Sequence, residues 1–239
     1  MRWPVIGVLL ALAAASCVVL TPTPLPTPTA TPFETPSEVS PMAVTLPEPR
    51  TESEISLEET LLRRRSIREY ADTPLTLQEV SQLLWAAQGE TAAWGGRTAP
   101  SAGALYPLEV YLVVGLVEGL APGVYKYSPE GHRLARIKEG DVRSELARAA
   151  VDQAWVKDGA VDIVIGAVYE RTTGKYGDRG VRYVYMEAGH AAQNVYLQAT
   201  ALDLGTVTVG AFFDGRVAEI VAMGQGEEPL YIIPVGKRK

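Results

Sequence analysis

The 239-residue sequence predicts an α+β domain with one central sheet, mixed or antiparallel, covered by helices. Three observations favour this class. Short β-branched apolar runs are typical of buried strands, and the clearest is 108–115. Capping residues followed by apolar positions at helical spacing indicate helices between these runs. A turn at 128–131 joins two runs as a hairpin. The order therefore mixes helices with hairpin and crossover strands.

Capping boxes begin two helices in the first half of the domain. One box is Ser56 to Glu59, and the other is Thr76 to Glu79. The second helix has one apolar face and is expected to end near Gly89. Its apolar positions are Leu77, Val80, Leu83, Leu84 and Ala87.

Further elements alternate along the rest of the chain. The expected strands are 108–115, 124–127, 134–137, 160–169, 206–212 and 230–233. The expected helices begin at Asp141 and end near Val151, run from Val181 to Leu204, and begin at Asp214 and end near Met223. The long helix 181–204 is the candidate for a central or interface helix.

Residues 1–17 resemble a bacterial lipoprotein signal. Arg2 supplies an early positive charge, an apolar run from Val5 to Ala15 follows, and the single cysteine, Cys17, comes directly after small residues. An uncleaved anchor helix is the alternative, since Trp3 to Leu20 is almost long enough to span a membrane. With Cys17 lipidated, no thiol remains for a disulfide or a nucleophile. We expect an exported lipoprotein whose only membrane contact is this anchor on the extracytoplasmic face.

Residues 18–50 are predicted to form a disordered Thr/Pro-rich tether. The stretch 21–50 holds nine of the chain's 17 prolines, many in Thr-Pro pairs. This density excludes helix and ladder pairing and favours an extended chain. Residues 51–239 are then one domain of ordinary size.

Composition and motif searches exclude several functions. The net charge of −6 argues against nucleic acid as a partner. The sequence shows no metal-ligand spacing, no Ser-His-Asp arrangement and neither of the common phosphate-binding glycine loops. His132 lies in the hairpin and His190 on a helix face, where structural roles are expected.

Two basic clusters are candidates for binding an anion. Arg64-Arg65-Ser66-Ile67-Arg68 places arginines around a serine, and such a fork of donors suits a phosphate. A solvated basic helix end is the alternative. Lys237-Arg238-Lys239 is a frayed tail by composition. It follows a buried strand with no slack after Gly236, so these cations can instead be held near the sheet edge.

Small residues suggest two places where backbone could approach a flat ligand. The loop 100–107 is closed by proline at each end and contains Gly103, which tolerates positive φ. The segment 208–212 ends a strand with small residues. A tight surface loop and a plain strand end are the alternatives.

Lys175 and Tyr176 are the candidate proton-transfer groups. They stand in a predicted loop, 175–180, between a strand and the long helix. A phenol becomes a base when a neighbouring cation favours its anion, and a desolvated lysine is itself a tunable base. An ordinary exposed loop is the alternative.

Taken together, these segments resemble the FMN-dependent nitroreductase fold and, more closely, its SagB-type dehydrogenase branch. That branch includes the azoline oxidases of thiazole/oxazole peptide maturation. The resemblance covers residues 61 to 239, and the order and spacing of four segments carry it. These segments are 64–68, 100–107, 175–183 and 187–194.

The resemblance implies an FMN site made by three groups of residues. Those that would neutralise the phosphate are Arg64, Arg68, Lys237 and Arg238, with Ser66 near the ribityl chain. Those that would line the isoalloxazine are Ser101, Ala102, Gly103 and Leu105. Those that would present N–H groups near flavin N5 are Gly210 and Ala211. Gln193 and Asn194 are expected to be structural.

The resemblance also implies a reaction and an assembly. Lys175 and Tyr176 match a pair that removes a carbon-bound proton while the flavin accepts a hydride from a small-molecule or azoline-like peptide substrate, with oxygen reoxidising the flavin. Family members are homodimers whose two flavin sites use both chains, so helix 181–204 is the candidate dimer core. An NAD(P)H-dependent nitro/quinone reductase and a non-enzymatic flavin- or ligand-binding lipoprotein are the alternatives.

Overall fold

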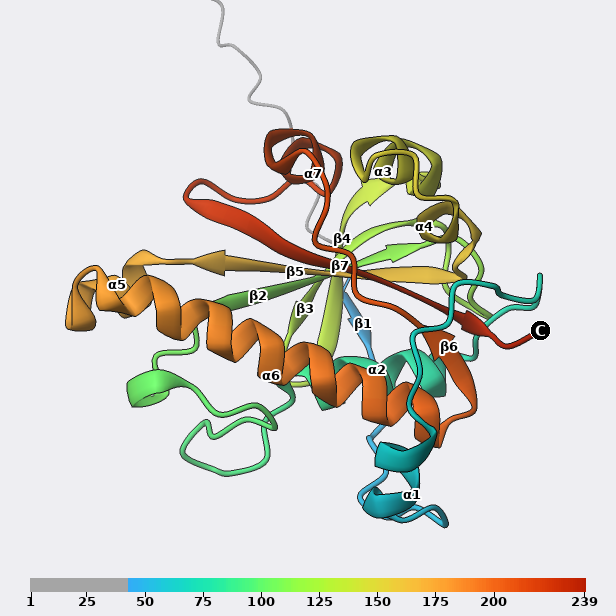
Figure 1. The fold of residues 1–239 in the computed structure, drawn as a ribbon, viewed down its shortest axis with the longest axis horizontal. Coiled ribbons are helices and arrows are strands. Elements are labelled where there is room, and N and C mark those ends of the chain that lie inside the picture. The colour runs from blue at the N-terminus through green and yellow to red at the C-terminus, as the bar shows by residue number, and fades with distance from the viewer. Residues whose placement is uncertain (1–42) are drawn as a thin grey trace, which may run out of the picture. The chain divides into compact units, whose positions relative to one another are not determined.

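A seven-stranded sheet forms the centre of the domain in the computed structural model, which describes residues 43–239. The strand order is β1-β4-β3-β2-β5-β7-β6, and every neighbouring pair is antiparallel (Figure 1). The strands are β1 (Ala43–Thr45), β2 (Leu108–Val114), β3 (Gly123–Ser128), β4 (Arg133–Glu139), β5 (Val161–Val168), β6 (Leu204–Thr206) and β7 (Glu227–Lys237).

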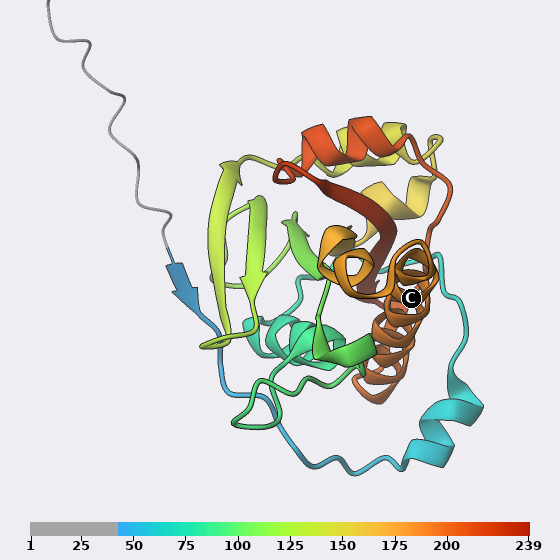
Figure 2. The same cartoon turned by 90° about the vertical axis from the view of Figure 1, so that its left-hand side faces the viewer.

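Helices cover both faces of this sheet. The helical elements are α1 (Leu57–Arg63), α2 (Leu77–Gln88), the 3₁₀ turn η1 (Ala102–Ala104), α3 (Arg143–Ala149), α4 (Ala154–Asp158), α5 (Glu170–Tyr176), α6 (Arg179–Ala201) and α7 (Asp214–Ile220). Helices α2 and α6 lie on one face, and α3, α4 and α7 lie on the other (Figures 1 and 2). The predicted α+β class with a helix-covered central sheet is confirmed.

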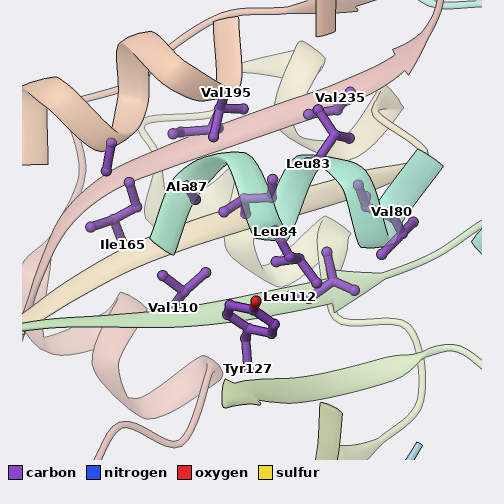
Figure 3. Packing of buried hydrophobic residues seen from close by; sticks show 14 of the residues in the cluster. Val80, Leu83, Leu84, Ala87, Val110, Leu112, Tyr127, Ile165, Val195 and Val235 are labelled. Atoms are coloured by element: carbon purple, nitrogen blue, oxygen red, sulfur yellow. The ribbon is translucent and has the colours of Figure 1, made fainter. Parts of the chain in front are cut away.

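Side chains along the central strands point alternately to the two faces of the sheet, so the core has two layers. On β5, Ile163 and Ile165 face α2 and α6, whereas Val164 faces the α3 and α7 layer. Figure 3 shows Leu83 and Leu84 of α2 packed toward the sheet in the first layer. Because both faces are covered, the central strands are apolar on both sides, which is why the sequence shows them as continuous apolar runs.

The two predicted capping boxes lie at the starts of α1 and α2. The Ser56 hydroxyl accepts the Glu59 amide at 3.1 Å. The Thr76 hydroxyl accepts the Glu79 amide at 3.2 Å, and the Glu79 carboxylate accepts the Thr76 amide at 2.9 Å. The second box therefore satisfies donors in both directions.

Replacing Thr76 by alanine is expected to lower the free energy of unfolding by about 1 kcal/mol, because it removes the side-chain acceptor for the first turn of α2. Chemical denaturation of the two proteins measures the difference. Thr73→Ala, at an exposed position just before the helix, is the matched control and is expected to change stability little. Equal effects of both substitutions would contradict the capping role.

The folded part begins earlier than predicted. Val44 of β1 pairs with Leu134 of β4, and Leu46 is only 3% exposed. The tether predicted for 18–50 is therefore wrong for residues 43–50. The stretch 43–46 contains no proline, so it can pair as an edge strand despite the proline-rich sequence before it. The predicted signal, Cys17 and the tether up to residue 42 lie outside the described residues.

Other boundaries differ by a few residues. Helix α6 ends at Ala201, so the predicted end at Leu204 is wrong, and Leu204 lies in β6. The strand predicted over 206–212 is shorter, since β6 ends at Thr206 and only Val209 then pairs, with Ile232 of β7. Within residues 43–239, no helix has the length and apolar character required to cross a membrane.

Candidate active site

The first predicted phosphate segment follows α1 and contacts α6 and α4. The Arg64 guanidinium lies 5.1 Å from the ring centre of Tyr196, and the Ser66 hydroxyl lies 3.0 Å from the Tyr196 hydroxyl. Arg68 lies 5.4 Å from the ring of Trp155. None of the ion pairs formed within residues 43–239 uses Arg64 or Arg68. Both cations are therefore open to an anionic ligand.

The end of the chain lies beside this segment, as the sequence predicts. The Ala71 amide donates to the Lys237 carbonyl at 2.9 Å, and Tyr70 pairs with Arg238. The two side chains, however, have acidic partners. The Lys237 ammonium pairs with Glu79 at 2.5 Å, and Arg238 lies 3.4 Å from Asp203. The backbones of the two basic segments are adjacent, but Lys237 and Arg238 are paired with carboxylates, so Arg64 and Arg68 are the better candidates for a phosphate.

Tyr196 links this segment to a second one that contains Gly210. The Thr208 amide donates to the Tyr196 hydroxyl at 2.9 Å. Burial alone would raise the pKa of Tyr196. Its hydrogen bonds with Ser66 and Thr208 and the charge of Arg64 have the opposite and larger effect, so the pKa lies below the ordinary 10.0. This role of Tyr196 is not visible in the sequence, because a tyrosine on the apolar face of a helix has the pattern of a core residue.

Gly210 and Ala211 are exposed beside the same group of residues. Gln153, just before α4, donates to the Ala211 carbonyl at 3.0 Å, and Val209 exchanges two hydrogen bonds with Ile232. The start of α4 thus lies beside Ala211 through Gln153 and beside Arg68 through Trp155. The predicted phosphate and N–H-presenting residues lie together near the C-terminal half of α6.

The small-residue loop forms a sharp turn near the other half of α6. Gly103, Ala104 and Tyr106 all have left-handed backbone, with φ of 66°, 53° and 45°. The Ser101 hydroxyl accepts the Tyr106 amide at 2.9 Å across the turn. Ser101, Ala102 and Leu105 are half-buried, while Gly103 is exposed. Gly103 therefore presents its backbone at the outside of the turn.

Lys175 and Tyr176 meet this turn at Gly103. A Cβ atom on Gly103 would lie 2.8 Å from the Tyr176 hydroxyl and 2.9 Å from the Lys175 ammonium. The two side chains come from the last turn of α5, so the predicted loop over 175–180 is wrong for these residues. The helix ends only at Gly177, whose φ is 57°. The candidate proton-transfer pair therefore lies against the loop of small residues.

Glu187 is a buried acid near Ser101, and no sequence motif predicts a role for it on its own. It belongs to α6 and is only 2% exposed. Burial raises its pKa from 4.5 to about 7, against the opposing effects of the Ser101 hydroxyl and the charge of Arg97. The only signal in the sequence was an acidic residue on the apolar face of a helix.

This pKa predicts how stability changes with pH. The folded state holds the Glu187 proton more tightly than the unfolded state, so stability is greatest below pH 4.5 and decreases as the pH rises to 7. Glu187→Gln cannot ionise. The free energy of unfolding of the wild type, relative to this variant, should fall by up to about 3 kcal/mol between pH 4.5 and 7. Denaturant titrations measure it, with the exposed Glu145→Gln as control; a constant difference would contradict the raised pKa.

The two histidines, His132 and His190, lie in different surroundings. His132, expected to be structural, has Nε2 at 2.6 Å from the Ser81 hydroxyl and Nδ1 at 2.8 Å from the Tyr127 hydroxyl. His190 is exposed on α6. In the part of the chain that the structure describes, no three histidine, cysteine, aspartate or glutamate side chains are grouped to hold a metal ion.

Sequence comparison identifies a family that agrees with this fold and with these candidate site segments. The profile of the nitroreductase family matches residues 61–237, so the chain belongs to the nitroreductase family and is an oxidoreductase. It is 54% identical over 185 residues to the nitroreductase-like protein MJ1384 of Methanocaldococcus jannaschii, covering 77% of this chain and 92% of the relative.

Solved structures give the same class. A nitroreductase-like protein from Ralstonia eutropha is 31% identical, with a TM-score of 0.73, over 84% of this chain and 91% of that one. A chain of the E. coli microcin synthetase McbBCD complex, solved with truncated pro-MccB17 bound, is 25% identical, with a TM-score of 0.64, over 80% of this chain and 77% of that one.

Proposed function

We propose that this protein is an FMN-dependent dehydrogenase that removes a hydride from a small-molecule or peptide substrate of the azoline type. The observation that carries the proposal is the meeting of the Lys175 ammonium and the Tyr176 hydroxyl at the exposed backbone of Gly103. A proton-transfer pair beside a loop of small residues suits the removal of a carbon-bound proton next to a flat cofactor. Similarity to a chain of a complex with a peptide precursor bound supports the peptide class.

The residues present fit FMN. Arg64 and Arg68 have no carboxylate partner among residues 43–239 and could hold the phosphate, with Ser66 beside the ribityl chain. Exposed Gly103 and Gly210 leave backbone open to a flat ring. Bound FMN would supply the hydride acceptor. The chain's own groups would hold the cofactor and the substrate, and the proton would pass to the neutral amine of Lys175 or to the phenolate of Tyr176.

The first experiment is to purify residues 43–239 and to reduce the FMN-loaded protein anaerobically. We expect an azoline-containing donor to bleach the visible flavin spectrum faster than NADPH does. Rapid bleaching by NADPH with no response to azoline donors would overturn the proposal. That result would support the second candidate, an NAD(P)H-dependent nitro/quinone reductase, which the 54% identity to a nitroreductase-like protein favours.

The proposal includes a homodimer with α6 at its interface. The candidate residues form two groups on this helix, one near Tyr183 and Glu187 and one near Tyr196. Tyr183 and Tyr196 are 13 positions apart, which corresponds to roughly 20 Å along the helix. Tyr185 and Met186 of α6 are 55% and 51% exposed, which suits a contact between protomers. Light scattering on the purified protein tests this, and a monomer that still turns over substrate would contradict it.

The N-terminal sequence adds a proposed location. We infer that Cys17 is lipidated and holds the protein on the extracytoplasmic face of a membrane. Full-length protein should incorporate a labelled fatty acid and partition with membranes, and Cys17→Ser should do neither. Label incorporation that survives this substitution would contradict the assignment.

A further inference from the structure

Helix α5, which carries the candidate proton-transfer pair, is linked to the loop of small residues by the Arg171 side chain. Arg171 lies one turn before Lys175, so the two side chains project from the same face of α5. Its guanidinium donates through Nη1 to the Tyr106 carbonyl at 3.1 Å and pairs through Nη2 with Glu109 of β2 at 2.5 Å. Among the side-chain hydrogen bonds and ion pairs of residues 43–239, no others join α5 to the loop 100–107 or to the sheet.

Glu109 is held in turn by a network of alternating charges that crosses the sheet. The Lys126 ammonium of β3 lies 3.1 Å from Glu109 and 2.7 Å from Glu227 of β7. Glu227 also accepts the Tyr111 hydroxyl. The side chains of Glu109 and Glu227 are only 15% and 7% exposed, so solvent and salt screen these pairs less than pairs on the surface. The position of the Arg171 guanidinium is therefore set by groups fixed on three strands.

The loop at the other end of Arg171 has a backbone that benefits from this anchor. Ala104 and Tyr106 adopt left-handed φ values of 53° and 45°, which are unfavourable for residues with side chains. Arg171 supplies a donor for the Tyr106 carbonyl, and a hydrogen bond from a charged donor is roughly twice as strong as a neutral one. Arg171 thus holds the loop at Tyr106, while Lys175, one turn further along α5, lies against Gly103 of the same loop.

We propose that Arg171 is a positioning residue: oriented by Glu109, it fixes α5 against the turn at Gly103 and so sets the position of the proton-transfer pair. Both contacts of Arg171 are seen in the structure, and only their catalytic consequence rests on the proposed function. A guanidinium is required rather than any cation, because its two terminal nitrogens reach a carbonyl and a carboxylate together.

Hydrogen exchange of the cofactor-free protein tests the positioning role. In Arg171→Gln, the amides of Tyr106 in the loop and of Gly177 at the end of α5 should exchange at least about tenfold faster. The Leu112 amide in the central strand β2 should exchange at an unchanged rate, because the Arg171 side chain is 42% exposed and its loss does not open the core. Unchanged exchange of the Tyr106 and Gly177 amides would overturn the proposal. Equal acceleration at Leu112 would also overturn it, since the substitution would then act on overall stability.

Two further variants test the geometry of the anchor. Arg171→Lys keeps the charge but not the fork of donors, so it should exchange like Arg171→Gln. Glu109→Gln removes the charge that orients Arg171 and leaves Lys126 paired with Glu227, so the same loop and helix amides should exchange faster. The double variant Glu109→Gln/Arg171→Gln should exchange no faster than Arg171→Gln alone. Exchange at the wild-type rate in Arg171→Lys, or additive effects in the double variant, would contradict the paired arrangement.

Flavin reduction gives the catalytic readout. With saturating azoline donor, Arg171→Gln should reduce flavin about 10- to 100-fold more slowly, because a displacement of about 1 Å in a reacting group can cost that much. The Kd for FMN should stay within about twofold of the wild type. Arg179→Gln is the matched control, since Arg179 is exposed at the start of α6 and forms none of the ion pairs within residues 43–239. Equal losses in both variants would indicate a general effect of charge and defeat the positioning role.

The experiments separate the two proposals. A wild type that reduces no flavin with an azoline donor would defeat the proposed function, and the exchange of the Tyr106 and Gly177 amides would still decide whether Arg171 fixes α5 against the loop. Flavin reduction at the wild-type rate in Arg171→Gln would leave the proposed function standing and defeat the role of Arg171 in positioning the proton-transfer pair.

Discussion

Lys175→Ala is expected to lower turnover of an azoline-type donor about 100-fold or more while leaving the affinity for FMN within about twofold of the wild type. A positioned acid or base contributes roughly 10²–10⁴ to a rate, and this ammonium is one of two groups aimed at the Gly103 backbone. It is exposed and takes part in none of the ion pairs within residues 43–239, so its removal should not disturb the fold. Stopped-flow flavin reduction measures the chemical step directly.

Tyr176→Phe is the companion variant and has a matched control nearby. Tyr183 packs edge-on against Tyr176, with ring centres 5.2 Å apart. Both Tyr→Phe changes keep the ring, but only Tyr176 places its hydroxyl against Gly103. We expect a large loss of flavin reduction in Tyr176→Phe and little change in Tyr183→Phe. Turnover that survives in both Lys175→Ala and Tyr176→Phe would remove the catalytic assignment and favour a flavin- or ligand-binding protein.

Local chemistry explains which elements could be predicted. Capping boxes at Ser56 and Thr76 are contacts between residues three apart, so the sequence contains all that is needed to place them. The edge strand β1 depends instead on β4, where Leu134 lies about 90 residues further along the chain, and the lack of proline in 43–46 permits this pairing without predicting it. The end of α5 was also missed. The helix continues through Tyr176 and stops at Gly177, which can adopt the left-handed backbone that ends a helix.

The candidate site divides in a similar way. The family resemblance assigned Gly103, Lys175 and Tyr176 to one site, and in the structure the Lys175 and Tyr176 side chains lie against Gly103. The partner of Lys237 could not be foreseen, because Glu79 lies 158 residues away and is already used in a capping box. Tyr196 and Glu187 were missed for a related reason: a polar group on the buried face of α6 acquires a role only through the loops that pack on it.

Arg68→Gln is expected to weaken FMN binding about 10- to 100-fold and to leave riboflavin binding unchanged. A hydrogen bond to a charged group contributes about 1.5–3 kcal/mol, which corresponds to that range in Kd. Riboflavin lacks the phosphate, so it reports the ring and ribityl contacts alone. Glutamine removes the guanidinium together with its contact 5.4 Å from the Trp155 ring, so unchanged riboflavin binding shows that the loss concerns the phosphate and not this contact.

Arg65→Gln is the matched control for this substitution. Arg65 belongs to the same basic run, but its guanidinium donates to the carbonyls of Leu62 and Arg64 at 3.0 and 2.8 Å, which directs it back toward α1. If the run acted only as a diffuse positive patch, both substitutions would weaken FMN binding alike, and added salt would remove the difference from the wild type. If Arg68 belongs to a specific phosphate site, only Arg68→Gln weakens FMN binding, and the loss of affinity persists in salt. Salt screens a direct hydrogen-bonded pair of guanidinium and phosphate less than it screens a diffuse attraction between exposed charges.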